Sequence, residues 1–177
     1  MSNRRRTLYQ GSFFVLNNEQ VMLPNGHETE LEVMHHPGAA AVIAVDADAR
    51  VCLLRQYRHA AGDWLWEIPA GKRDGDEEPA STAVRELQEE AGITAQSWAP
   101  LGYIYTTPGF CDEQIHLYLA QGLSHVSHAR EAAEVMEVHW LPLVEIEALA
   151  ARGEITDGKT LCALYRWSLF RRQNQLV

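Results

Sequence analysis

The sequence lacks any apolar run approaching the roughly 18 residues that a membrane-spanning helix requires. Arg4, Arg5 and Arg6 are not followed by an apolar segment of signal-peptide length, so we expect a solvated tail there. The three cysteines are odd in number and far apart, which excludes a disulfide framework and a zinc pattern. We therefore expect a reduced, cytoplasmic protein in which Cys52 and Cys162 are buried as small hydrophobic residues.

The composition is that of an ordinary soluble globular protein. The 177 residues are 46% hydrophobic and 22% charged, which is enough apolar material for one core and too much for a disordered chain. The formal net charge of −9 argues against a nucleic-acid partner, which normally requires a basic surface. An acidic protein can still bind phosphates if divalent cations bridge the two.

The residue pattern predicts an α+β fold with a mixed sheet and helices packed on it. Two strands, 7–23 and 28–36, flank a turn at Asn25-Gly26, where both residues tolerate positive φ. Residues 1–36 are therefore expected to form a small antiparallel sheet, and residues 37–177 the main domain. Further strands are expected at 39–45, 51–58, 64–68, 99–105, 114–120 and 134–140, and helices at 79–91, 142–151 and 158–173.

The helix at 79–91 carries an unusual cluster of acidic residues. Its apolar stripe predicts a core face of Ala80, Ala83, Val84, Leu87 and Ala91. The carboxylates of Glu86, Glu89 and Glu90 are expected on the opposite side, three and four residues apart, where like charges repel. They also lie near the end of the helix where the dipole disfavours anions.

Two interpretations of this acidic cluster are open on these grounds. A hard divalent cation such as Mg²⁺ or Mn²⁺ prefers oxygen ligands and would remove the repulsion between the carboxylates. A metal held in this way handles phosphates, because it neutralises their charge and can activate water. The alternative is an ordinary solvated acidic face.

The segment from Gly71 to Ile93 resembles the complete Nudix box. Gly71 is followed after five residues by Glu77, and after seven more by Arg85-Glu86-Leu87-Gln88-Glu89-Glu90-Ala91-Gly92-Ile93. The resemblance implies an αβα sandwich with a mixed sheet and hydrolysis of nucleoside diphosphates linked to another group. It implies that Arg85 orients the carboxylates and that Glu77 supports them. The metal ligands that it implies are Glu86, Glu90, Glu89 and the backbone carbonyl of Ala70.

Segments outside the box resemble the ADP-ribose pyrophosphatase branch of that family. They are Thr7–Gly11, Arg55–Arg58, Leu65–Gly71, Thr107–Glu113 and Gly153–Thr160. The resemblance implies a homodimer whose N-terminal sheet reaches the partner, with Glu67 beside the metals. The substrate-binding residues that it implies are Arg58, Pro108, Gly109 and Glu113. Phe13 or Phe14 is a candidate for stacking on adenine, with a core or interface position as the alternative.

The activity implied is Mg²⁺-dependent hydrolysis of ADP-ribose to AMP and ribose 5-phosphate. The general base is expected to be Glu134 or Glu131, and Glu89 is the alternative. Another nucleotide sugar, such as GDP-mannose or ADP-glucose, is an alternative substrate, and a non-catalytic nucleotide-binding module is a second alternative. The histidines His35, His36, His125 and His128 lack metal-ligand spacing and are expected at surface or turn positions.

Overall fold

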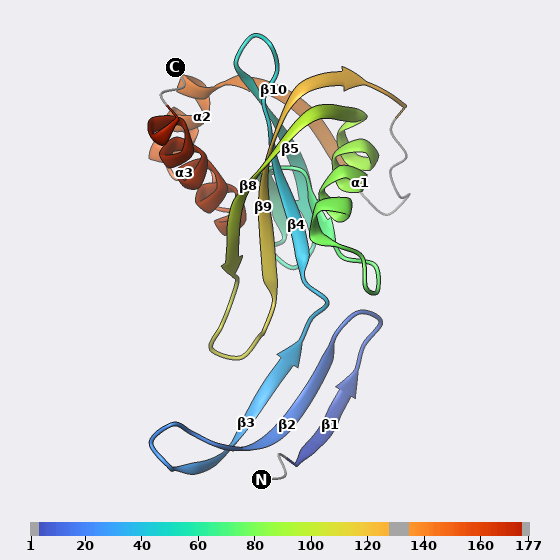
Figure 1. The fold of residues 1–177 in the computed structure, drawn as a ribbon, viewed down its shortest axis with the longest axis vertical. Coiled ribbons are helices and arrows are strands. Elements are labelled where there is room, and N and C mark those ends of the chain that lie inside the picture. The colour runs from blue at the N-terminus through green and yellow to red at the C-terminus, as the bar shows by residue number, and fades with distance from the viewer. Residues whose placement is uncertain (1–3, 128–134, 175–177) are drawn as a thin grey trace.

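A computed structural model describes residues 4–127 and 135–174 of the chain. The molecule has two parts along its long axis (Figure 1). A three-stranded N-terminal sheet lies at one end, and two further sheets between helices form the larger part. This arrangement is the α+β, αβα-type architecture that the sequence predicted.

The N-terminal sheet consists of β1 (Arg5–Gln10), β2 (Val15–Met22) and β3 (Glu28–His35), paired antiparallel in that order. The prediction of one strand over 7–23 was wrong, because the chain turns between β1 and β2. The amide of Gly11 donates to the Phe14 carbonyl at 2.9 Å in this turn. The predicted turn between β2 and β3 is confirmed, with Gly26 at φ 81°.

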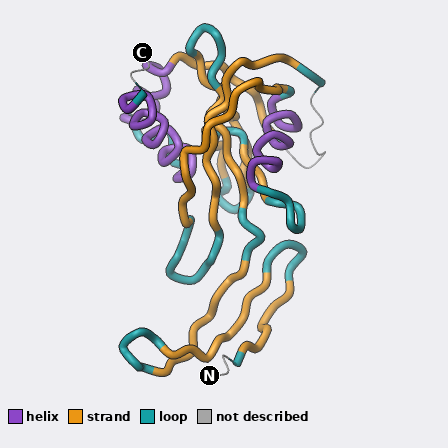
Figure 2. Tube along the Cα trace, viewed as in Figure 1, coloured by secondary structure: helices purple, strands orange, loops and turns teal. Residues whose placement is uncertain are grey.

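This sheet has no apolar core of its own among the described residues. Figure 2 shows its strands standing apart from the helices. All of β1 is exposed, and the buried side chains of β2 are polar, namely Asn17 and Glu19. Leu8, Tyr9, Phe13, Met22 and Leu31 are exposed apolar residues of this region. Such surface is usually covered by another element or another chain.

The larger part contains two sheets. The first has the order β7-β4-β9-β8, in which β4 and β9 are parallel and the other pairs are antiparallel. The second has the order β10-β5-β6 and is antiparallel. The bounds are β4 (Ala39–Ala44), β5 (Arg50–Arg58), β6 (Asp63–Glu67), β7 (Ala70–Lys72), β8 (Ile93–Tyr105), β9 (Gln114–His125) and β10 (Met136–Pro142).

Helices cover both sides of the central strand β4. Helix α1 (Pro79–Ala91) lies on one side, and α2 (Leu143–Ala151) and α3 (Gly158–Gln173) lie on the other (Figure 1). Ala40 and Val42 of β4 belong to the core cluster that contains Leu87 of α1, whereas Ile43 belongs to the cluster that contains Trp167 of α3. Both faces of β4 are buried, which explains its continuous apolar sequence.

Three local features differ from the expectation. Strand β8 starts at Ile93, immediately after the helix, and the short strand β7 was not predicted. Cys52 is buried as expected, but Cys162 is exposed on α3. Helix α1 begins with Pro79 and ends at Gly92, whose φ of 66° is left-handed, as the sequence indicated.

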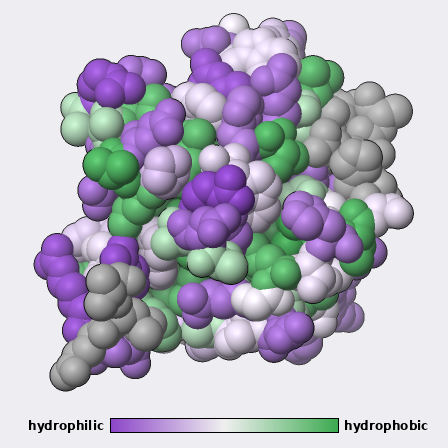
Figure 3. Space-filling model, turned by 90° about the horizontal axis from the view of Figure 1, so that it is seen from above, coloured by the Kyte–Doolittle hydropathy of each residue, from purple (hydrophilic) through white to green (hydrophobic). Residues whose placement is uncertain are grey.

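The outer surface carries both polar and apolar residues. On the face in Figure 3, apolar residues form small groups between polar ones. Across the described part of the chain, no helix combines the length and apolar composition that crossing a bilayer requires.

Candidate active site

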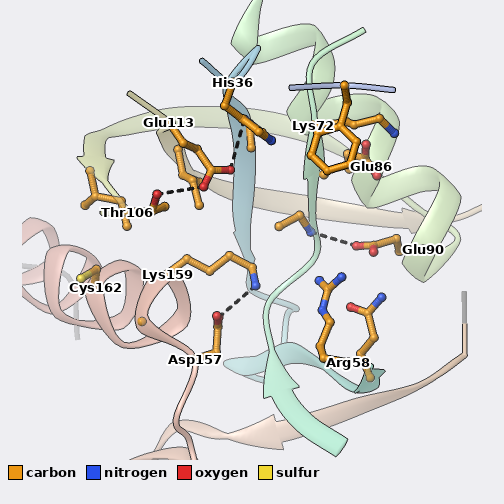
Figure 4. A pocket seen from close by; sticks show the side chains of 18 of the residues that line it. His36, Arg58, Lys72, Glu86, Glu90, Thr106, Glu113, Asp157, Lys159 and Cys162 are labelled. Atoms are coloured by element: carbon orange, nitrogen blue, oxygen red, sulfur yellow. Dashed lines mark hydrogen bonds and ion pairs between the residues drawn. The ribbon is translucent and has the colours of Figure 1, made fainter. Parts of the chain in front are cut away.

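A cavity of about 670 Å³ opens between α1, the start of α3, β5, β7 and the end of β8 (Figure 4). Its size is that of a small-molecule site. Acidic residues of α1 line one side, and Lys159 and Asp157 of the α3 region line the other. Lys72 and Lys159, which are the only lysines in the sequence, both line this cavity.

The acidic residues of α1 are more buried than the sequence predicted. Glu86 is 7% exposed and Glu90 is 2% exposed, and both lie on the buried face with Ala83 and Leu87. Val84, predicted in the core, is 42% exposed. A helical-wheel prediction misplaces the buried face because it assigns every carboxylate to the solvent side. Here hydrogen bonds stabilise the carboxylates of Glu86 and Glu90 in buried positions.

Arg85 connects the carboxylates of the motif. Its guanidinium donates to Glu86 at 2.6 Å, to Glu89 at 3.0 Å and to Glu77 at 3.0 and 3.2 Å. A fourth acceptor is the carbonyl of Lys72 at 3.0 Å. Hydrogen bonds from Arg85 lower the pKa of Glu77 to about 2. One cation thus offsets much of the repulsion between three carboxylates.

Strand β7, which precedes α1, approaches these carboxylates closely. The amide of Ala70 donates to Glu90 Oε2 at 2.8 Å. A Cβ built on Gly71 would overlap the carboxylate of Glu86. Glycine is therefore required at position 71 while Glu86 keeps this position.

The donor set fits a hard divalent cation, although it is not preassembled. Among the described residues, no three His, Cys, Asp or Glu side chains converge as a ready-made metal site. Glu86 is held by Arg85, and Glu90 is held by the Ala70 amide. Both carboxylates nevertheless line one cavity together with Ala70 and Glu89, and Mg²⁺ prefers oxygen ligands of this kind.

Glu67 is surrounded by cations. Its carboxylate is 2% exposed and accepts two hydrogen bonds from Arg58, both at 2.8 Å. Lys159 Nζ donates to Glu67 Oε2 as well and lies 3.1 Å from Asp157 Oδ2. Burial raises the pKa of Glu67, but the hydrogen bonds from Arg58 and the charge of Lys159 outweigh it, so the net pKa is lowered. Glu67 is therefore ionised and paired at neutral pH.

The predicted substrate residue Glu113 lines the far end of the cavity. It accepts a hydrogen bond from Thr106 Oγ1 at 2.8 Å and lies 3.4 Å from His36 Nδ1. Phe13 also lines the cavity and contacts the His36 ring edge-on, with centroids 5.5 Å apart. Phe14 is not among the lining residues and packs on Phe13.

His35 and His36 were expected at surface or turn positions, but both are half-buried and lie next to carboxylates. His35 lies between two carboxylates, 2.7 Å from Glu19 and 2.6 Å from Asp112. The hydrogen bond with Glu19 is the main cause that raises the pKa of His35. Because Glu19 is in β2 and Asp112 is in the loop between β8 and β9, His35 links the N-terminal sheet to the larger part.

Most of the predicted site residues are thus brought together, and others are not. Those that line the cavity are Arg58, Ala70, Arg85, Glu86, Glu89, Glu90 and Glu113. Pro108 and Gly109 are exposed in the loop after β8 and are not lining residues. Glu67, predicted beside the metals, is not among the lining residues and is paired with Arg58 and Lys159. Glu131 and Glu134 lie outside the described residues.

Several lining residues were not predicted, and Lys159 and His36 are the main ones. The sequence held a signal for Lys159, because Asp157 and Thr160 form a helix start. That start fixes where the first turn of α3 lies. We find no comparable signal for His36, which reaches the cavity because β3 hydrogen-bonds to the loop at Phe110.

Comparisons with known proteins agree with this geometry. The NUDIX domain family matches residues 34–164. The chain is 42% identical over 157 residues to the ADP-ribose pyrophosphatase of Mycobacterium tuberculosis (strain H37Rv), covering 86% of this chain and 75% of that protein. It is 38% identical over 162 residues to the ADP-ribose pyrophosphatase of Bacillus subtilis (strain 168), covering 90% and 88%. A solved structure described as an ADP compounds hydrolase has a TM-score of 0.83 at 21% identity and covers 98% of this chain and 95% of that chain.

Proposed function

Since this chain belongs to the NUDIX family, we propose that it hydrolyses the pyrophosphate bond of ADP-ribose to give AMP and ribose 5-phosphate. The observation that carries the proposal is that two buried carboxylates, Glu86 and Glu90, and the guanidinium of Arg58 line one cavity. Ion-binding oxygens and a phosphate-binding cation lie within the same site. The two ADP-ribose pyrophosphatases described above support the choice of substrate.

Glu86, Glu90 and the Ala70 carbonyl would hold the divalent ion, which we propose to be Mg²⁺, with Mn²⁺ as a substitute. When bound, such an ion polarises phosphoryl oxygens and lowers the pKa of a coordinated water. Arg85 keeps Glu86 and Glu89 oriented toward the cavity. Arg58 presents its guanidinium to a phosphate oxygen, a group with which arginine forms paired hydrogen bonds.

The general base remains a prediction from the sequence. Glu131 and Glu134 are the first candidates and lie outside the described residues. Glu89 is the alternative that the structure describes. Its side chain is 37% exposed, and it bonds Arg85 at 3.0 Å. It is the most exposed carboxylate of the α1 cluster, so it can reach a water molecule with the least rearrangement.

The first test is product release from ADP-ribose, ADP-glucose, GDP-mannose, a dinucleoside polyphosphate and an oxidised nucleoside triphosphate, with Mg²⁺ and with chelator. We expect ADP-ribose to be preferred and chelator to abolish the reaction. Preference for another nucleotide sugar would replace the substrate but keep the metal site. No turnover on any compound would favour a nucleotide-binding module.

Two substitutions test the metal ligands. Glu86→Gln and Glu90→Gln keep the shape of the side chains, and we expect each to lower kcat/KM by more than about 100-fold. Glu147→Gln, at an exposed position of α2, is the matched control. Full activity in either site variant would contradict the assignment.

We further propose that the protein is a homodimer formed through residues 1–36, with residues 37–177 as the hydrolase domain. The support is the N-terminal sheet, whose apolar residues Leu8, Tyr9 and Leu31 are exposed in one chain. Light scattering on the eluting protein measures the mass directly. A double change, Leu8→Glu with Leu31→Glu, should shift a dimer toward monomer, whereas a wild-type monomer would refute the proposal.

A further inference from the structure

Lys159 is a half-buried cation at the edge of the cavity, in the first turn of α3. Its side chain is 11% exposed. Nζ donates to Glu67 and lies 3.1 Å from Asp157. Figure 4 shows Lys159 and Arg58 entering the cavity from different elements. Burying an ammonium group is costly unless it is paired, so the two carboxylates keep Lys159 in place.

Glu67 joins Lys159 to Arg58. Both of its oxygens accept from Arg58, and Oε2 also accepts from Lys159. A carboxylate offers about four acceptor positions, and cationic donors fill three of those on Glu67. Lys159 therefore restricts how the Glu67 carboxylate can rotate, and with it the plane of the Arg58 guanidinium.

Arg58 uses only part of its donor set in this arrangement. Nε and Nη2 bond Glu67, while Nη1 has no acceptor among residues 4–127 and 135–174. Because Arg58 lines the cavity, the remaining edge of its guanidinium is available to an anion there. Its direction depends on Glu67 and hence on Lys159.

We propose that Lys159 is a positioning residue for substrate binding: by fixing Glu67 together with Arg58, it sets the orientation in which Arg58 meets a phosphate oxygen of the nucleoside diphosphate. This inference rests on the proposed function. In this proposal Lys159 acts on substrate binding through Glu67 and Arg58.

A double-mutant cycle between Lys159 and Arg58 tests the proposal. Lys159→Met removes the charge at similar length, and we expect KM to rise by about 10-fold or more with a smaller change in kcat. Arg58→Met should raise KM at least as much. In the Arg58→Met background, Lys159→Met should have no further effect, because the two residues act on one interaction.

Two further variants and a binding measurement complete the test. Lys159→Arg keeps a cation against Glu67 and should restore most of the affinity. Glu67→Gln should weaken binding in the same way as Lys159→Met, even if the latter folds poorly. Dissociation constants for ADP-ribose, measured by calorimetry in the presence of chelator, give the same cycle without turnover.

Multiplicative effects of Lys159→Met and Arg58→Met would overturn the proposal, because Lys159 would then act independently of Arg58. An unchanged KM in Lys159→Met would do so as well. A lower melting temperature with unchanged KM would show that Lys159 is only structural. If the wild-type protein neither binds nor hydrolyses ADP-ribose, the proposed function fails, and the cycle is repeated with whichever nucleotide sugar the protein hydrolyses.

Discussion

The amide of Ala70 donates to the carboxylate of Glu90 at 2.8 Å, across 20 residues of sequence. This bond holds the start of β7 against the last turn of α1. Two residues earlier, the Ile68 amide donates to Thr160 Oγ1 at 2.9 Å. The position of the segment 68–70 is therefore set by side chains from two helices on opposite sides of the sheet.

Gly71→Ala should impair metal binding while leaving the fold intact. The added Cβ would overlap the Glu86 carboxylate, which is the movable end of a side chain and would leave its place beside Arg85. We expect the Mg²⁺ concentration for half-maximal activity to rise by about 10-fold or more. Ser81→Ala, at an exposed position of α1 that does not line the cavity, is the control. Unchanged metal dependence in Gly71→Ala would refute this reasoning.

Thr160→Val should destabilise the protein by about 1–3 kcal/mol, because it leaves the buried Ile68 amide without an acceptor. Valine has nearly the same shape, so packing changes little. Urea unfolding measures the effect, and Thr160→Ser, which keeps the hydroxyl, should lose clearly less. Equal losses in both variants would mean that the methyl group of Thr160 matters rather than its oxygen.

The contribution of His35 to stability should depend on pH. Its pKa is raised in the folded state, chiefly by the hydrogen bond with Glu19, so its pairing with Glu19 and Asp112 stabilises the fold fully below about pH 6.5. This stabilisation is lost as the pH rises through the folded pKa. The difference in unfolding free energy between wild type and His35→Gln should therefore shrink between pH 6 and pH 9. A difference that stays constant across this range would contradict the assignment of this stabilisation to His35.

Chemical labelling of amines should distinguish the two lysines by their reaction rates. Lys72 is exposed, whereas Lys159 is half-buried and paired with Glu67 and Asp157, so acetic anhydride should modify Lys72 first. Peptide mass spectrometry measures both rates. Glu67→Gln should speed the modification of Lys159 and leave Lys72 unchanged. If the two lysines react at the same rate in the wild type, the ion pairs of Lys159 do not persist in solution.

Local sequence patterns predicted much of the fold. The predicted bounds of α1 are confirmed at both ends. Proline favours the first turn of a helix, and glycine favours the left-handed conformation of the residue that ends it. Strand β4 was recognisable because both of its faces are buried. The turn at Gly11–Phe14 was missed, because an exposed strand pair carries little apolar alternation to mark its ends.

The site was predictable from one continuous motif and, outside that motif, only from the branch resemblance that pointed to Arg58 and Glu113. The region from Gly71 to Glu90 was found because its members are close in sequence. Lys159 and Glu67 are 92 residues apart and meet only because α3 packs beside β6. Glu86 and Glu90 were assigned to the wrong face of α1, since charge alone predicted exposure. Glu90 accepts from the Ala70 amide, 20 residues away, and Glu86 accepts from the neighbouring Arg85, which also bonds the Lys72 carbonyl outside the helix.

The placement of both lysines in one cavity affects how this protein should be attached to surfaces. Sensor chips and resins that couple through primary amines react with lysine side chains, and the lysines of this sequence are Lys72 and Lys159. Both line the cavity, so coupling through a lysine would block the site in the captured molecules. Immobilisation through a terminal tag would keep the cavity open, and comparing the two preparations would show how much apparent inactivity comes from the coupling chemistry.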